Sequence, residues 1–355
     1  MAGDGESRVR SLEPAGSVAE RLRIQAGYCE RIGSSLYAGL LGRAAEDFEA
    51  GGPVADVLGG HDGDPADSML ALRLMGAVNR LVLRGVEPAL GELYAAAERN
   101  PEAEWVEFRT VVERNAVELR ELVELPVQTN EVGRCAALLP GFLAIAAETG
   151  LPLRLLEVGA SAGLNLRWDA YRYRAGDFAW GPAGSPVTLD FELTGEIHSN
   201  PPAGVEVAER RGCDAAPVDV ATAEGRETLL AYVWPDQRSR LERLRAALEL
   251  AASLPVAVDR ESAAAWIERQ LAEPAPGRAT VVFHSIVFQY LSEAERAAFE
   301  SHLREAAGRA TVDAPLAWLR MEPAGELAEV RLTVWPGGEK RLLGRAGYHG
   351  SPVVL

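Results

Sequence analysis

Lysine is almost absent from this chain of 355 residues: Lys340 is the only one among 36 basic side chains. A mechanism that needs a lysine Schiff base would depend on that residue alone, so we do not expect a Schiff-base enzyme. Cysteine is also scarce, and Cys29, Cys135 and Cys213 form no close pair. This spacing favours buried free thiols over a disulfide framework or a zinc ribbon.

Long apolar runs are missing as well. No stretch of about 18 apolar residues occurs and the first residues contain no apolar signal segment, so we expect a cytoplasmic protein without a membrane partner. The net charge of -16 is spread along the chain, which argues against a nucleic-acid partner. With 48% apolar residues available for a core, the composition favours a soluble globular protein.

The spacing of apolar residues divides the chain into two parts. Up to about residue 150 the apolar residues recur at helical spacing, which predicts an α-helical N-terminal domain over residues 1–150. From residue 151 to 355, β-rich runs alternate with helical stretches, which predicts an α/β domain with a mainly parallel sheet. The expected strands include 153–158, 255–258, 279–288, 315–321 and 328–335, and the expected helices include 164–172, 261–272 and 292–307. Residues 176–204, rich in Gly and Pro, are expected to form an insertion.

The stretch "LRLLEVGASAGLNLRWDAYRY", residues 153–173, places an acid and two glycines between an expected strand and an expected helix. Gly159 would allow a sharp turn and Gly163 close packing of the helix, because glycine has no Cβ. Backbone amides exposed at the helix start would favour an anionic or polar ligand group. Ser161 stands where a pyrophosphate usually requires glycine, so the turn favours a ligand without pyrophosphate.

This turn resembles motif I of class I S-adenosylmethionine-dependent methyltransferases. Glu157, Gly159 and Gly163 match that motif, and Ser161 departs from it. The resemblance implies a Rossmann-like mainly parallel sheet, S-adenosylmethionine as cofactor, and methyl transfer to a small or medium-sized acceptor. Over its whole length the chain also resembles the bacterial family called domain of unknown function 2332, through "PVQTNEVGRCAALLPGF", "RRGCDAAPVDV", "VVFHSIVFQYL" and the terminal "GYHG". That second resemblance implies no particular reaction.

The methyltransferase resemblance assigns roles to several acids. Asp214 takes the place of the acid that binds the ribose hydroxyls, or Glu209 does so if the strand is "VEVAER". Asp259 takes the place of the acid beside the adenine amino group. Capping of a turn or a helix is the alternative role for Asp214 and Asp259.

Two residues before the first expected strand of the α/β domain are further candidates for cofactor binding. Asn130 or its neighbour stands where a helix cap belongs, in "PVQTNEVGR". Arg134 would pair with the methionine carboxylate of the cofactor, because a guanidinium matches carboxylate geometry. A surface ion pair between Arg134 and Glu131 is the alternative.

The stretch "VVFHSIVFQYL" supplies the candidates for catalysis. It resembles the strand whose end lies beside the methyl group, and its polar residues His284 and Ser285 interrupt an apolar run. His284 could accept the proton of the acceptor, or it could pack with a hydrogen bond to a backbone carbonyl. Tyr290 follows on the same stretch.

Tyr171 and Trp168, together with Tyr290, are expected to line the acceptor pocket.

Two other functions are compatible with the sequence. "GASAG" is also similar to a nucleophile elbow, in which Ser161 would be a hydrolase nucleophile served by one of the later histidines. A non-catalytic binding protein with a Rossmann-like fold is the second alternative.

No metal site is expected. The stretch "GHDGDPADS", with His61, Asp62, Asp64 and Asp67, lacks the glycine and the glutamate of a calcium loop. We therefore expect a turn followed by a helix cap there.

Overall fold

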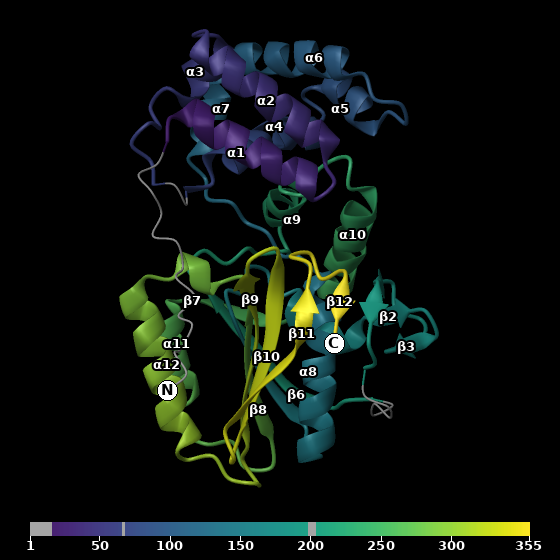
Figure 1. Ribbon diagram of the computed structural model, residues 1–355, viewed down its shortest axis with the longest axis vertical. Coiled ribbons are helices and arrows are strands. Elements are labelled where there is room, and N and C mark those ends of the chain that lie inside the picture. Colours follow the sequence, from purple (N-terminus) through teal and green to yellow (C-terminus); the bar gives the residue numbers. More distant parts are fainter. Residues whose placement is uncertain (1–15, 66–67, 198–203) are drawn as a thin grey trace, which may run out of the picture. The chain divides into compact units, whose positions relative to one another are not determined.

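The computed structural model describes residues 16–65, 68–197 and 204–355. Within these, the chain separates into two compact units (Figure 1). The first contains the residues up to 128 together with 227–241, and the second contains 129–226 together with 242–355. The expected border near residue 150 thus differs from the observed one, because the helix of residues 134–149 belongs to the second unit.

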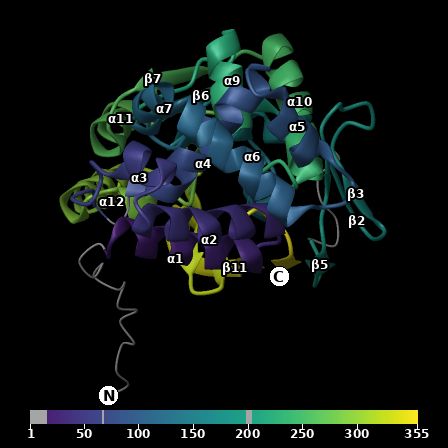
Figure 2. The same cartoon turned by 90° about the horizontal axis from the view of Figure 1, so that it is seen from above.

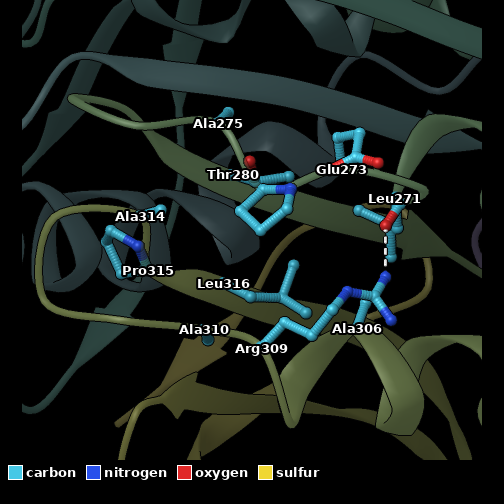
Figure 3. A pocket seen from close by; sticks show the side chains of 11 residues that line it. Leu271, Glu273, Ala275, Thr280, Ala306, Arg309, Ala310, Ala314, Pro315 and Leu316 are labelled. Carbon is cyan, nitrogen blue, oxygen red and sulfur yellow. Dashed lines mark hydrogen bonds between the residues drawn. The ribbon is translucent and has the colours of Figure 1, made fainter.

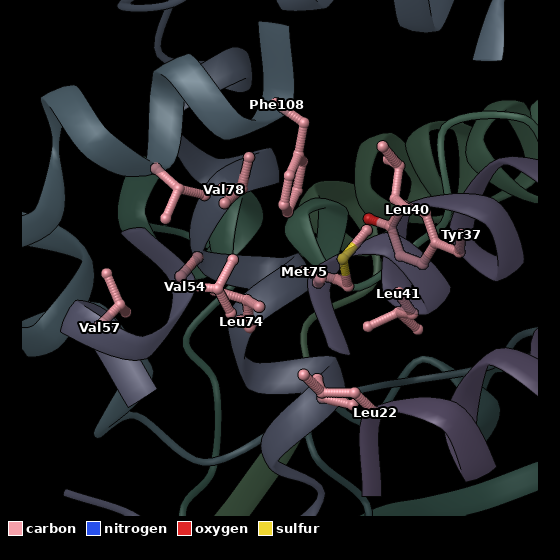
Figure 4. Packing of buried hydrophobic residues seen from close by; sticks show 14 of the residues in the cluster. Leu22, Tyr37, Leu40, Leu41, Val54, Val57, Leu74, Met75, Val78 and Phe108 are labelled. Atoms are coloured by element: carbon pink, nitrogen blue, oxygen red, sulfur yellow. The ribbon is translucent and has the colours of Figure 1, made fainter. Parts of the chain in front are cut away.

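The first unit is built mainly from seven helices, which Figures 1 and 2 show from two sides. Ser34 interrupts the apolar pattern after the first helix, and its hydroxyl caps the second by accepting from the Tyr37 amide at 3.1 Å. Buried side chains of α1–α4 and α6 fill one core (Figure 4). The seven helices are α1 (Val18–Arg31), α2 (Ser35–Glu49), α3 (Pro53–Leu58), α4 (Leu70–Leu83), α5 (Pro88–Ala95), α6 (Pro101–Arg114) and α7 (Ala116–Val123).

Residues 227–241 return to this unit from a distant part of the sequence. Trp234 packs against Tyr37, with ring centroids 5.7 Å apart. Asp236 accepts hydrogen bonds from the Ser34 hydroxyl at 2.8 Å and the Leu36 amide at 3.2 Å, so it completes the start of α2. The periodicity of the first 150 residues contains no sign of this return.

The second unit contains a mixed, mostly parallel sheet of nine strands in the order β5-β12-β11-β10-β9-β8-β1-β6-β7. A separate sheet, β3-β2-β4, is formed in and next to the expected insertion. The strands are β1 (Leu153–Val158), β2 (Arg172–Ala175), β3 (Phe178–Trp180), β4 (Thr188–Asp190), β5 (Leu193–Thr194), β6 (Val207–Asp214), β7 (Ala257–Arg260), β8 (Ala279–Ser285), β9 (Leu316–Ala324), β10 (Leu327–Trp335), β11 (Glu339–Ala346) and β12 (Val353–Val354). Residues 198–203 of the insertion lie outside the described residues.

The helices of the second unit complete its layers. Helix α8 packs on one face of the sheet, against β8–β11, while α11 and α12 pack together and contribute to the core on the other face. The helices are α8 (Arg134–Thr149), α11 (Ala263–Gln270) and α12 (Glu293–Ala307), with the short 3₁₀ helices η2 (Asn165–Ala170) and η3 (Phe288–Tyr290). Helices α9 (Ala223–Ala231) and α10 (Arg238–Ser253) each belong partly to the first unit and partly to the second. The helix expected at 164–172 is therefore a 3₁₀ helix.

The strand order determines where a ligand site is expected. From β1 the chain adds β6 and then β7 on one side, and it returns to add β8 and then β9 on the other side. All four pairings from β7 to β9 are parallel. Ligands bind such sheets beyond the carboxyl ends of the strands, at the point where the order reverses. In this sheet that point lies between β1 and β8.

Two further expectations concern membranes and thiols. Among the described residues, no helix has both the length and the apolar character needed to cross a membrane. Cys29, Cys135 and Cys213 are buried free thiols, as the sequence predicts.

Candidate functional site

The turn after β1 has the positive φ angles that its glycines suggest. Gly159 and Gly163 have φ of 67° and 66°, and Ser161 between them has φ of 51°. A Cβ on Gly159 would lie 2.4 Å from Val287, and one on Gly163 would lie 2.7 Å from Val256. Both glycines are therefore required by positive φ and by close packing within the protein.

Backbone amides of the turn are bonded to side chains of the protein. The Ser161 amide donates to Asp214 Oδ2 at 2.8 Å. Asn130 Oδ1 accepts from the amides of Ala162 at 3.3 Å and Leu164 at 2.9 Å. The sequence predicted that these amides face a ligand. The structure contradicts this for Ser161, Ala162 and Leu164, because each of their N–H groups already has a hydrogen-bond partner inside the fold. Asn130 thus caps the turn after β1 rather than α8.

Asp214 is the last residue of β6 and lies beside this turn. Its second oxygen accepts from the Ala216 amide at 2.9 Å, and the residue is partly exposed. Each carboxylate oxygen has two lone pairs, so Asp214 keeps acceptor capacity for a ligand. The alternative acid, Glu209, lies near the other end of β6 and pairs with Arg154 at 3.0 Å. The strand register therefore favours Asp214 over Glu209 as an acid at the carboxyl edge.

Glu157, near the end of β1, is a buried carboxylate that is only partly satisfied. It is 2% exposed, and its Oε2 atom has no hydrogen-bond partner among the described residues. Burial raises the pKa of Glu157 well above its usual range, against the opposing hydrogen bond from Asn165. The negative charge of Asp214 raises this pKa further, while the charges of Arg167 and Arg134 lower it.

Side chains that the sequence did not single out surround Glu157. The Cys135 thiol lies 3.3 Å from the Asn165 side-chain oxygen. Arg167 is 2% exposed and donates to the carbonyls of Gly163 and Leu254, both at 2.7 Å. Asn165 and Arg167 follow the glycine turn by only a few residues. This short distance was the one feature of the sequence that could have indicated that they lie near Glu157.

Arg134 joins three segments at the start of α8. Its Nε atom donates to the Tyr348 carbonyl and its Nη1 atom to the Ser285 carbonyl, both at 3.1 Å. Tyr348 belongs to the terminal "GYHG", which packs so tightly here that a Cβ on Gly133 would lie 2.3 Å from the His349 carbonyl oxygen. Two of the five donors of Arg134 thus hold the end of β8 and the "GYHG" segment in place.

Asp259 is fully engaged within the protein. Its carboxylate pairs with Arg211 at 2.9 and 3.1 Å and accepts from the Trp266 indole at 2.7 Å. The hydrogen bond from Arg211 lowers the pKa of Asp259 to about 2. Asp259 pairs in register with Cys213, so its side chain lies on the same face of the sheet as Arg211, the face that packs against α11. The ion pair with Arg211 there takes the place of the expected adenine contact.

His284 is buried with both ring nitrogens bonded. The Trp318 indole donates to Nε2 at 3.0 Å, so Nδ1 carries the proton and donates to Glu322 at 2.6 Å. Its ring stacks on Phe288 with centroids 4.3 Å apart. The expected role as a base is not supported, since no lone pair is free. The partners are an indole and a carboxylate rather than the backbone carbonyl of the alternative.

Glu322 fixes the loop after β8. Besides the His284 ring, its carboxylate accepts from the amides of Val287 at 3.1 Å and Phe288 at 3.3 Å. Ile286, just before them, has φ of 57°, which is costly for a β-branched residue by about 1–3 kcal/mol. Strained residues therefore follow both β1 and β8, on the two sides of the point where the strand order reverses.

The residues expected to line an acceptor pocket lie in two different environments. Trp168 and Tyr171 are 0% exposed; the first stacks on Phe142 and the second donates its hydroxyl to the Leu164 carbonyl at 2.5 Å. They form core packing rather than a surface. Tyr290 is 56% exposed on η3.

Ser285, expected to act in catalysis, is 6% exposed, and its carbonyl is held by Arg134.

Two other regions, a polar turn and a mainly apolar pocket, lie outside the cluster around Glu157. His61 bonds to Asp64 at 3.0 Å, and Asp64 pairs with Arg73 at 2.9 Å, while Asp67 lies outside the described residues. A pocket at the amino ends of β8 and β9 is lined mainly by small and apolar side chains, with Arg309 donating to the Leu271 carbonyl (Figure 3). It lies at the opposite end of these strands from Glu157.

The fold and the polar cluster define an α/β protein with a partly buried acidic site at the reversal point of a mostly parallel sheet. The chain belongs to the family described as an uncharacterized protein conserved in bacteria, DUF2332, whose model matches residues 19–354. No curated protein matches the sequence.

Proposed function

We propose that the second unit binds S-adenosylmethionine at the carboxyl ends of β1, β6 and β8, and that the protein is a methyltransferase with a Rossmann-like domain and a small or medium-sized acceptor. The observation that carries this proposal is the contact between Asp214 and the Ser161 amide at 2.8 Å. It brings an acid 53 residues further along the chain beside the glycine turn, which supports a nucleoside site at this edge of the sheet.

The residues at this edge fit such a cofactor in part. Asp214 is partly exposed and has free lone pairs for the ribose hydroxyls, and Glu157 has an unpartnered oxygen for a donor group. Asp259 does not fit, because its carboxylate is bonded to Arg211 and Trp266. The adenine group would therefore be held by packing and backbone atoms rather than by Asp259.

When bound, the cofactor supplies an electrophilic methyl group for an in-line displacement. The chain's own contribution to such a reaction is mainly to position the acceptor and exclude water. Arg134 holds the end of β8 and Glu322 holds the loop after it. Asn130 holds the turn after β1. His284 takes no part in moving the proton, since both its nitrogens are bonded.

Calorimetry with S-adenosylmethionine and S-adenosylhomocysteine tests the proposal. We expect Asp214→Ala to weaken binding by about 1–3 kcal/mol, through the loss of charge-assisted hydrogen bonds. Glu209→Ala, which removes an acid from the other end of the same strand, should leave the affinity unchanged. Thermal melting of each variant checks that the turn held by Asp214 is intact. The absence of binding heat with the folded wild-type protein would contradict the proposal.

The hydrolase alternative has one observation in its favour and one against it. Ser161 has a positive φ, as expected for a sharp strand-to-helix turn. A nucleophile elbow, however, exposes its serine, whereas Ser161 is 3% exposed. Labelling of Ser161 by a serine-reactive phosphonate would overturn the methyltransferase proposal in favour of a hydrolase.

A further inference from the structure

One face of β9, β10 and β11 carries several cations that the proposed function does not use. On β11, Arg341 bonds to Glu148 of α8 at 2.6 Å, so its side chain lies on the α8 face. Lys340, its neighbour, lies on the opposite face because successive side chains alternate along a strand. Lys340 pairs in register with Thr333 on β10, and Thr333 pairs with Trp318 on β9.

Two arginines lie directly opposite each other on this same face. Arg331 of β10 pairs in register with Arg320 of β9, two residues along from the pair of Thr333 and Trp318. Like charges placed opposite each other destabilise a sheet unless something compensates them. The arrangement is unexpected in a chain whose net charge is -16.

Glu329 and Glu322, which pair in register on this face, are hydrogen-bonded to groups other than Arg320. Glu329 bonds to Arg331 at 2.6 and 2.9 Å and to Arg345 at 3.2 Å. Glu322 accepts from His284 and from the amides of the loop after β8. Neither of these carboxylates therefore serves as the hydrogen-bonded counterion of Arg320.

Arg320 itself is held but not satisfied. Its guanidinium lies over the Trp318 ring, with Cζ 3.8 Å from the centroid, and its Nη1 atom is buried without a hydrogen-bond partner among the described residues. Burial, and next the charge of Arg331, lower the pKa of Arg320, while the charges of Glu300 and Glu322 raise it. On the adjacent register pair, Thr333 is 1% exposed and its hydroxyl is also unpartnered.

We propose that this face is a binding site for an oxyanion, the phosphate or carboxylate group of a small molecule, held by Arg320 and Thr333. A guanidinium fixed in one plane and a neighbouring hydroxyl supply donors of the kind that such oxyanions accept. Arg331 and Lys340 add positive charge beside them. The inference does not depend on the proposed methyl transfer, because none of these residues belongs to the cluster around Glu157.

Calorimetry with inorganic phosphate, and separately with acetate, tests this site at constant ionic strength. We expect saturable binding of at least one of the two, and the tighter one identifies the oxyanion that the site prefers. Arg320→Ala should weaken that binding by about tenfold or more, and Thr333→Val by about fivefold. Affinity for S-adenosylhomocysteine should be the same in these variants as in the wild type.

Arg174→Ala is the matched control. Arg174 pairs with Asp190 in the separate three-stranded sheet, so this variant removes one positive charge from the same unit without touching the proposed site. It should bind the anion as the wild type does. If Arg320→Ala does not fold, Arg331→Ala is the second variant, and we expect an affinity at least about threefold weaker. Absence of saturable binding, unchanged binding in the folded Arg320 variant, or equal loss in the control would each overturn the inference.

Discussion

Two acid-containing clusters lie near the ends of β1 and β8, and they differ in how their hydrogen bonds are satisfied. Around His284, the indole of Trp318 and the carboxylate of Glu322 occupy both ring nitrogens. Around Glu157, one carboxylate oxygen is buried without a partner among the residues that the structure describes. Both residues are polar interruptions in apolar strands, and both are almost completely buried.

The comparison shows that a polar residue in a buried strand does not by itself indicate chemistry. A buried group whose donors and lone pairs are all used stabilises the fold and has no capacity left for a ligand, whereas a buried atom without a partner costs stability unless a ligand completes it. By this criterion Glu157 is the functional candidate and His284 is a structural residue.

The largest effect is expected for His284→Ala. The change removes a buried ring, leaves the Trp318 indole without its acceptor and takes one of its hydrogen bonds from Glu322, so we expect a loss of about 2–4 kcal/mol in the free energy of unfolding. Chemical denaturation measures this loss. His302→Ala, a histidine on α12 that is partly exposed, should change stability by less than about 0.5 kcal/mol. A near-neutral His284 variant would contradict the structural role.

A smaller effect of opposite sign is expected for Glu157→Gln. Because the folded pKa of Glu157 lies above its unfolded value of about 4.3, the protein gains stability from this group at low pH and loses it as the pH rises through the folded pKa. At pH 8 the glutamine variant should therefore be more stable by about 1–3 kcal/mol, since it buries no ionisable group.

Chemical denaturation of the wild type and of Glu157→Gln from pH 4 to pH 8 measures how steeply the free energy of unfolding of each protein changes with pH. Glu326→Gln, an exposed position in a turn, serves as the control and should keep the wild-type slope. Equal slopes in the wild type and Glu157→Gln would show that Glu157 is ionised in the folded protein without cost.

The smallest effect is expected for Asp259→Asn. The folded pKa of about 2 lies below the unfolded value of about 3.9, so this carboxylate stabilises the protein above the unfolded value and loses that effect as the pH falls through the folded value. We expect a loss of about 1–2 kcal/mol at pH 7 that disappears near pH 2. Binding of S-adenosylmethionine should be unchanged, and a weaker affinity would instead support the adenine contact.

Much of the local structure follows from the sequence. The strand at 153–158 is observed as β1 with the same bounds, and the helix expected at 292–307 is observed as α12, where the Ser292 hydroxyl accepts from the Glu295 amide at 3.2 Å. The Glu295 side chain, however, accepts from the Ala263 amide of α11 at 3.1 Å. A local capping rule predicts the helix start but cannot predict such a partner from another helix.

The candidate site was predicted only in part, for a related reason. The resemblance to the second methyltransferase motif predicted Asp214, with Glu209 as the alternative, and the bond from the Ser161 amide to Asp214 shows that this acid lies beside the glycine turn. Asp259 also ends near that edge, yet its side chain lies on the other face of the sheet with Arg211. A shift of one residue along a strand reverses the face, and the expected bounds of this strand, 255–258, differ from the observed β7 at 257–260.

Three features could be read from the residues alone: the alternation of strands and helices, the turn at Gly159 and Gly163, and the burial of the cysteines. These features depend on side-chain size, polarity and spacing along a short segment. Three features depend on the folded chain: residues 227–241 complete the helical unit, His284 has no free nitrogen, and Glu157 and Arg320 each keep a buried atom that lacks a partner among the described residues. Whether a buried polar atom is satisfied depends on residues brought together from distant segments, and no local pattern records them.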